Sequence, residues 1–156
     1  MGKRGLTLFT CCAVLMAGTA MAECDAETLA VRGDFGEVRF SVDVADDASE
    51  RAQGLMFVEQ MGTFEGMLFV FERPQTTSFW MRNTLIPLDM IFIGADGVVD
   101  SIHENAVPLD ETPIFGGDAI QYVLEVNGGL SSRLGLSVGD TVQHPSIAGD
   151  VIWPCD

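Results

Sequence analysis

Residues 64–93 read FEGMLFVFERPQTTSFWMRNTLIPLDMIFI, and apolar runs alternate there with short polar turns. The segment holds five of the ten Phe residues and one of the two Trp residues. The runs at 67–71 and 88–93 are too short for helices of their own and are typical of buried strands. A Thr- and aromatic-rich strand is expected at 75–81. The polar corner at 80–84, between two apolar strands, is therefore the first place to look for a site.

The rest of the chain shows the same pattern of short strands and turns. Further strands are expected at residues 29–31, 40–44, 98–102, 119–126 and 141–142. Asp46 or Asp47 is expected to cap a short helix that Gly54 ends, and Glu50 follows Asp47 at the spacing of a capping box. Residues 130–134 are expected to form a second helical turn, and residues 105–118 a loop. This pattern predicts a mainly β (α+β) fold, an antiparallel β sandwich or barrel-like domain with one or two short helices.

Residues 1–22 have the composition of a secretory signal peptide. A positively charged start precedes an apolar run at 6–17, and small residues follow at Ala20 and Ala22. We expect cleavage before Glu23, which predicts a periplasmic or secreted protein. A membrane anchor is the alternative, although the apolar run is short for a bilayer span.

The remaining residues, 23–156, are expected to form a single domain. They contain six Arg, no Lys and all 23 acidic residues, which gives a formal charge of −17. Nucleic acid and anionic membrane surfaces are poor partners for such a chain. We expect no stable membrane insertion after cleavage, and an unidentified small molecule or cell-wall component as the partner.

Two cysteines, Cys24 and Cys155, remain after the expected cleavage. They lie near the two ends of the mature chain, and export would place them in an oxidising compartment. We therefore expect a disulfide that joins the termini. The alternatives are two free thiols or an intermolecular bridge.

A set of motifs resembles the DUF192 family, also called UPF0127, over about residues 38–142. The matching residues are Arg51, Gly54-Leu55-Met56, Gly66-Met67-Leu68-Phe69, Ser78-Phe79-Trp80-Met81-Arg82-Asn83-Thr84, Pro87-Leu88-Asp89 and Val123-Leu124-Glu125-Val126-Asn127. The resemblance implies a largely β, often exported protein. It does not imply an activity, because the family is uncharacterised.

Two acidic residues lie within strongly apolar strands. Asp89 is expected on the same face as Ile91 and Ile93, because side chains alternate along a strand. Glu125 stands between Leu124 and Val126. A carboxyl among apolar neighbours must be paired, or its pKa must rise. Arg51 and Arg82 are the expected partners of these two acids.

These residues suggest a ligand-binding pocket as the leading hypothesis. The candidate residues are Trp80, Arg82, Asn83 and Asp89, with Glu125, Asn127 and Arg51 closing the pocket. In this interpretation one carboxylate is a general base, an Arg fixes an anionic group, and Trp80 and Asn83 orient the ligand. The alternatives are a buried ion-pair network with Trp80 as packing, and a hydrolase- or lyase-like enzyme on a periplasmic polysaccharide. That enzyme would use Asp89 or Glu125; no other catalytic residue is assigned.

A copper carrier is a third possibility, because thioether sulfur suits Cu(I). The candidate ligands are Met56, Met61, Met67, Met81, Met90, His103 and His144. They contain no Met-x-Met or His-x-Met cluster, so Met as core filler is the alternative. Zinc motifs and nucleotide-binding loops are absent from the sequence, and neither a metal nor a cofactor is expected.

Overall fold

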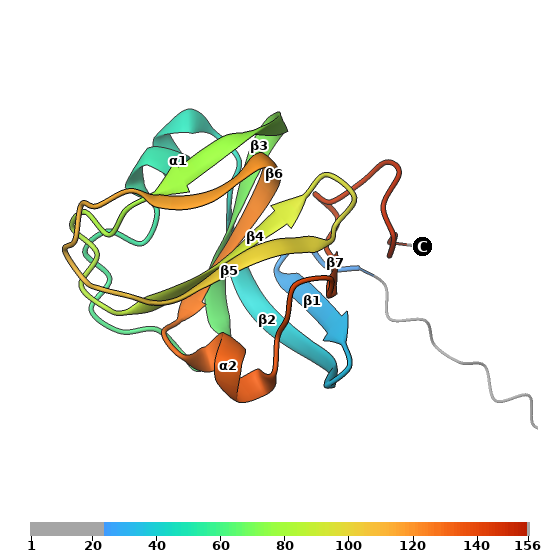
Figure 1. Ribbon diagram of the computed structural model, residues 1–156, viewed down its shortest axis with the longest axis horizontal. Coiled ribbons are helices and arrows are strands. Elements are labelled where there is room, and N and C mark those ends of the chain that lie inside the picture. The colour runs from blue at the N-terminus through green and yellow to red at the C-terminus, as the bar shows by residue number, and fades with distance from the viewer. Residues whose placement is uncertain (1–23, 156) are drawn as a thin grey trace, which may run out of the picture.

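The computed structural model describes residues 24–155, which form one seven-stranded sheet curled into a half-barrel (Figure 1). The strands are β1 (Thr28–Gly33), β2 (Gly36–Ala45), β3 (Glu65–Phe79), β4 (Leu88–Gly94), β5 (Val99–Ala106), β6 (Ile114–Asn127) and β7 (Thr141–Gln143). The helices are α1 (Ala48–Gln53) and α2 (Leu130–Leu134). The order of the strands in the sheet is β5-β4-β6-β3-β2-β1-β7. An isolated bridge between Val98 and Thr141 brings the two edges of the sheet together. The predicted mainly β, barrel-like fold is confirmed.

The sheet is antiparallel except for one pair of strands. β2 and β3 run parallel, because the chain between them crosses over through α1. Among the described residues neither helix is long and apolar enough to cross a bilayer. Figure 1 shows α1 and α2 on opposite sides of the molecule.

Two hydrophobic clusters cover the two faces of the central strands. In β4, Ile91 and Ile93 belong to the first cluster, which fills the curl of the sheet together with residues of β1, β2 and β7. Met90 and Phe92 belong to the second cluster. Because both faces are buried, β4 is apolar almost throughout instead of alternating between apolar and polar residues. An acidic residue in such a strand is enclosed whichever face it occupies.

Several predicted boundaries are wrong in an instructive way. The strands predicted at 67–71 and 75–81 are one strand, β3, whose register with β6 shifts between Val70 and Gln75. Pro74 lies in that irregular stretch, where the missing N–H breaks no regular ladder. The predicted loop at 105–118 is only residues 107–113, because β6 begins at Ile114 and accommodates its glycines in bulges.

The capping box of α1 is confirmed. The Asp47 carboxylate accepts hydrogen bonds from the N–H groups of Ser49 (2.7 Å) and Glu50 (2.9 Å). The Glu50 side chain accepts one from the Asp47 N–H at 3.4 Å. Gly54 ends the helix with a φ of 49° and donates to the Glu50 carbonyl. This short, well-capped helix holds Arg51 at a fixed place beside β3.

Cys24 and Cys155 are joined by a disulfide in the structure, with their Cα atoms 5.7 Å apart. We expect residues 24–155 to contain no free thiol, and the C24S/C155S double variant to lose about 3 kcal/mol of unfolding free energy. The measurements are thiol titration under denaturing conditions and urea unfolding with and without reductant. Two free thiols in protein recovered without reductant would contradict the pairing, and a dimer seen only without reductant would indicate an intermolecular bridge.

Candidate functional site

A pocket of about 410 Å³ opens between α1, β3 and the loop that follows β3. Its aromatic lining consists of Phe69, Phe71, Phe79 and Trp80. Its charged lining consists of Arg51, Arg82 and Glu125. The volume falls in the range of pockets that hold small organic molecules. Four of the seven predicted site residues therefore line one cavity, which we call the Glu125 pocket.

Glu125 is the most unusual group in this pocket. It lies on β6 between Met67 of β3 and Met90 of β4, and it is 4% exposed. Within residues 24–155 its carboxyl has no ion pair or hydrogen bond. Every fully enclosed side-chain oxygen or nitrogen in these residues has a hydrogen-bond partner. Since the Glu125 carboxyl has none, it is not fully enclosed, and it opens onto the pocket that it lines. Burial raises the pKa of Glu125 to about 8, and at pH 7 about nine in ten of these carboxyls carry a proton.

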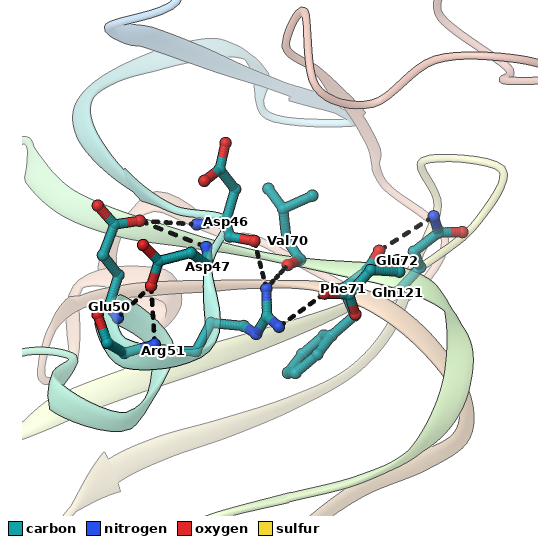
Figure 2. A network of polar contacts seen from close by, with 9 residues as sticks. Asp46, Asp47, Glu50, Arg51, Val70, Phe71, Glu72 and Gln121 are labelled. Carbon is teal, nitrogen blue, oxygen red and sulfur yellow. Dashed lines mark hydrogen bonds and ion pairs between the residues drawn. The ribbon is translucent and has the colours of Figure 1, made fainter.

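Arg51 is held rigidly at one side of the pocket. Its guanidinium donates hydrogen bonds to the carbonyls of Asp46 and Val70 and forms an ion pair with Glu72 at 2.8 Å (Figure 2). It also lies over the Phe71 ring, with its carbon 5.3 Å from the ring centroid. The Arg51 side chain is 14% exposed. It shapes the pocket wall, but much of its hydrogen-bonding capacity is already used by the protein.

Arg82 is in a different situation. Its guanidinium carbon lies 5.5 Å from the centroid of the Trp80 ring, and Trp80 itself is 46% exposed. The ion pairs found in residues 24–155 are Arg39–Glu37 and Arg51–Glu72, so Arg82 has no acidic partner there. The expected pairing of the buried acids with Arg51 and Arg82 is therefore wrong. Arg82 and Trp80 instead form an exposed cation–π pair at the pocket.

Asp89 is fully buried but does not line the pocket. Its Oδ1 accepts hydrogen bonds from the N–H groups of Asn105 (2.8 Å) and Gly129 (2.7 Å). Its Oδ2 accepts from the Ser131 N–H (2.8 Å) and from the Ser131 hydroxyl. The carboxylate thus joins β4 to the end of β5 and to the start of α2. As expected from strand alternation, it shares a face with Ile91 and Ile93.

The two buried acids point to opposite faces of the sheet. Asp89 stands opposite Val126 in the ladder between β4 and β6, whereas Glu125 stands opposite Met90. Because neighbours along a strand alternate in direction, the two carboxyls cannot meet in one cleft. The prediction that Asp89 lines the binding pocket, or acts beside Glu125 as an acid–base group, is therefore wrong.

Asn83 and Asn127 do not line the pocket either; they position its wall. The Asn83 side-chain amide donates to the Met56 sulfur at 3.8 Å, and the Asn83 backbone carbonyl accepts a hydrogen bond from the Phe57 N–H at 2.9 Å. The Asn127 amide donates to the Gly62 carbonyl at 2.7 Å. Both contacts attach the segment after α1, which supplies Leu55 and Met56 to the pocket.

Four of the five methionines considered above as copper ligands pack in or against one apolar cluster. Met81 and Met90 are buried in the second cluster, which Met61 and Met67 also contact. His144 is buried elsewhere, with its Nε2 2.9 Å from the Ala26 carbonyl oxygen. In the described part of the chain no group of three His, Cys, Asp or Glu residues is placed to hold a metal ion.

Sequence reasoning missed the apolar half of the pocket. The missed lining residues include Phe69, Phe71, Phe79, Leu55 and Met56. The signal was present, because alternation along β3 puts Phe69 and Phe71 on the same face as Met67, the cross-strand neighbour of Glu125. An aromatic pocket with one acid could therefore have been predicted from this face of β3 and its neighbour Glu125.

The fold and the pocket define a small curled-sheet β domain with an acid-containing aromatic cavity. The chain belongs to the DUF192 family, described as "Uncharacterized ACR", whose profile matches residues 29–144. The predicted membership is thereby confirmed.

Two solved structures are similar over most of the chain. One is a protein of unknown function from Novosphingobium aromaticivorans DSM 12444, 42% identical, covering 83% of this chain and 98% of its own, with a TM-score of 0.73. The other is a Sinorhizobium meliloti 1021 protein described as a "putative transcription regulator", 41% identical, covering 79% of this chain and 96% of its own, also with a TM-score of 0.73. Comparison with curated proteins gives no match.

Proposed function

We propose that this protein is an exported module that binds a small organic molecule in the Glu125 pocket. The observation that carries the proposal is a buried, unpaired carboxyl that opens onto a cavity walled by four aromatic rings, and burial raises the pKa of this carboxyl. A buried carboxyl without a hydrogen-bond partner lowers the stability of a fold. Such a group has a physical reason to persist when a ligand supplies the missing partner. Export rests on the composition of residues 1–22 and on the Cys24–Cys155 pair.

Nucleic acid is not the ligand we propose, despite the description of the Sinorhizobium protein. The expected mature chain carries six Arg against 23 acids, and phosphate backbones bind to basic surfaces. A pocket of about 410 Å³ fits a small molecule instead.

The test is a thermal-shift screen of sugars, cell-wall fragments and small organic acids against the mature protein. We expect at least one compound to raise the melting temperature of the wild type. The pocket-filling variant A52W should abolish this shift, because Ala52 lines the pocket. The matched variant A48W, at the start of the same helix and outside the lining, should retain it. A wild type that responds to no compound, or an A52W protein that responds like A48W, would contradict the proposal.

An enzyme is the second candidate, and one observation favours it. A carboxyl with a pKa of about 8 holds its proton at neutral pH and can act as a general acid. Since Asp89 lies on the other face of the sheet, this reaction would use Glu125 as its single carboxyl. Turnover of a polysaccharide by the wild type, lost in E125Q, would support the enzyme; binding without turnover supports the module.

A further inference from the structure

We propose that the ligand of the Glu125 pocket is a small organic carboxylate with a flat apolar body. Its charged group would lie against Arg82, and its body among the aromatic rings. This inference rests on the proposed function and narrows it to one chemical class. Three features of the pocket lead to it: the sign of its charged lining, the availability of Arg82, and the shape of its walls.

The lining of the pocket is positively charged in an acidic protein. Two of the six Arg residues of the expected mature chain, Arg51 and Arg82, line it. Its single acidic lining residue is Glu125, which is mostly uncharged at pH 7. Glu72 offsets the charge of Arg51, but Arg82 has no acidic partner in residues 24–155. The pocket lining therefore attracts anions, and this sign opposes that of the chain as a whole.

Of the two cations, Arg82 is the one available to a ligand. Arg51 already binds two backbone carbonyls and Glu72 (Figure 2). Arg82 has no ion pair in residues 24–155 and is held only over the Trp80 ring. Its planar group of N–H donors matches the two oxygens of a carboxylate. Arg82 is thus the natural contact for the anionic end of a ligand.

The walls specify the other part of the ligand. The edge-to-face pair of Phe69 and Phe79, together with Phe71 and Trp80, favours a flat ring or conjugated chain. An amine is the obvious competitor, since a carboxylate surrounded by aromatic rings can hold a cation. The two arginines disfavour it, because like charges in one small cavity repel.

The charges around Glu125 also predict how binding responds to pH. Its strand neighbours Met67 and Met90 are uncharged, so the charged groups that share the pocket are Arg51 and Arg82. When Glu125 loses its proton, the carboxylate repels an anionic ligand and can no longer donate a hydrogen bond. In E125Q the amide still donates but cannot ionise, so that variant should bind equally at pH 7 and pH 9.

The experiment uses three probes of matched shape: 3-phenylpropanoate, 3-phenylpropanamide and 3-phenylpropylamine. Calorimetric titration of the mature protein at pH 7 should show the carboxylate binding at least about tenfold more tightly than the amide, with no binding of the amine. R82Q should remove this preference and leave amide binding unchanged. R133Q, which makes the same charge change outside the pocket lining, should behave as the wild type. Carboxylate binding to the wild type should weaken about tenfold from pH 7 to pH 9, and binding to E125Q should not.

The outcomes separate this inference from the proposed function. Tighter binding of the amine or the amide, abolished by A52W, would overturn the carboxylate class and leave a ligand-binding pocket. A carboxylate preference that survives R82Q would overturn the assignment to Arg82. If none of the three probes binds, the carboxylate class is overturned; if the wider screen also gives no shift, the proposed function is overturned as well.

Discussion

Replacing Glu125 with Met should stabilise the protein, and the gain in unfolding free energy should grow as the pH rises. The folded pKa of Glu125 is about 8, against an ordinary value of 4.5. Below pH 4.5 the carboxyl is protonated in both states, and its ionisation costs no stability. Between pH 4.5 and 8 the unfolded chain releases the proton more readily than the folded protein does. The free energy of unfolding therefore falls as the pH rises through this range, and it levels off above the folded pKa. The loss at pH 9 is on the order of 5 kcal/mol.

The measurement is urea unfolding of wild type and E125M from pH 4.5 to 9. Methionine is close to Glu in length and fits between Met67 and Met90, so it should remove the ionisation without opening a cavity. The control is E104M, which replaces an exposed acid on β5 and should change stability by less than about 0.5 kcal/mol at every pH. An E125M protein less stable than wild type at pH 9 would show that the carboxyl has a stabilising partner. E125M should also bind no carboxylate probe at high affinity, since the hydrogen-bond donor is gone.

Replacing Asp89 with Ala should have the opposite effect and destabilise the protein by about 3–5 kcal/mol. The change leaves three backbone N–H groups, those of Asn105, Gly129 and Ser131, without their acceptor. Gly129 has a φ of 72° and begins α2 without a side-chain cap of its own, so the carboxylate is what anchors that end of the helix. D89N retains one acceptor oxygen and should lose less.

Urea unfolding and amide hydrogen exchange test this prediction. The amides of Gly129 and Ser131 donate to different oxygens of Asp89, so at least one of them should exchange much faster in D89N than in wild type, because an NH2 group replaces its acceptor. D43A is the matched control, since Asp43 is an exposed acid on β2, and its unfolding free energy should stay within about 0.5 kcal/mol of wild type. Under conditions where D89N is folded, its ligand binding should be intact, because Asp89 lies on the face away from the pocket. A D89A protein as stable as D43A would contradict the structural role.

Much of the fold was predictable from local sequence. The α1 capping box at Asp47 and Glu50 and the helix stop at Gly54 follow from local hydrogen bonding, and strand β4 follows from a short continuous apolar run. The predictions failed where Pro and Gly lie inside long strands. Pro74 in β3 and the glycines of β6 suggested loops, whereas bulges accommodate them within the sheet. Local composition indicates a turn but does not show whether a neighbouring strand continues past it.

The candidate site was predicted only in part. Arg51, Trp80, Arg82 and Glu125 do line one pocket. Asp89 resembled Glu125 in the sequence, since each acid stands between two apolar residues. The register between β4 and β6 places them on opposite faces of the sheet, and this register depends on the whole curl of the sheet.

The sequence by itself determined that two carboxyls would be buried in apolar strands, because alternation and hydrophobicity act over a few neighbouring residues. Only the tertiary structure decided which carboxyl is satisfied. The donors to Asp89 come from residues 16, 40 and 42 positions away, brought together by the ends of β5 and β6. Glu125 receives no such donors within the described chain and opens onto the pocket instead. Hydrogen-bond partners of a buried group are supplied by the fold, and that is why Asp89 has four donors while the Glu125 carboxyl has none within the described residues.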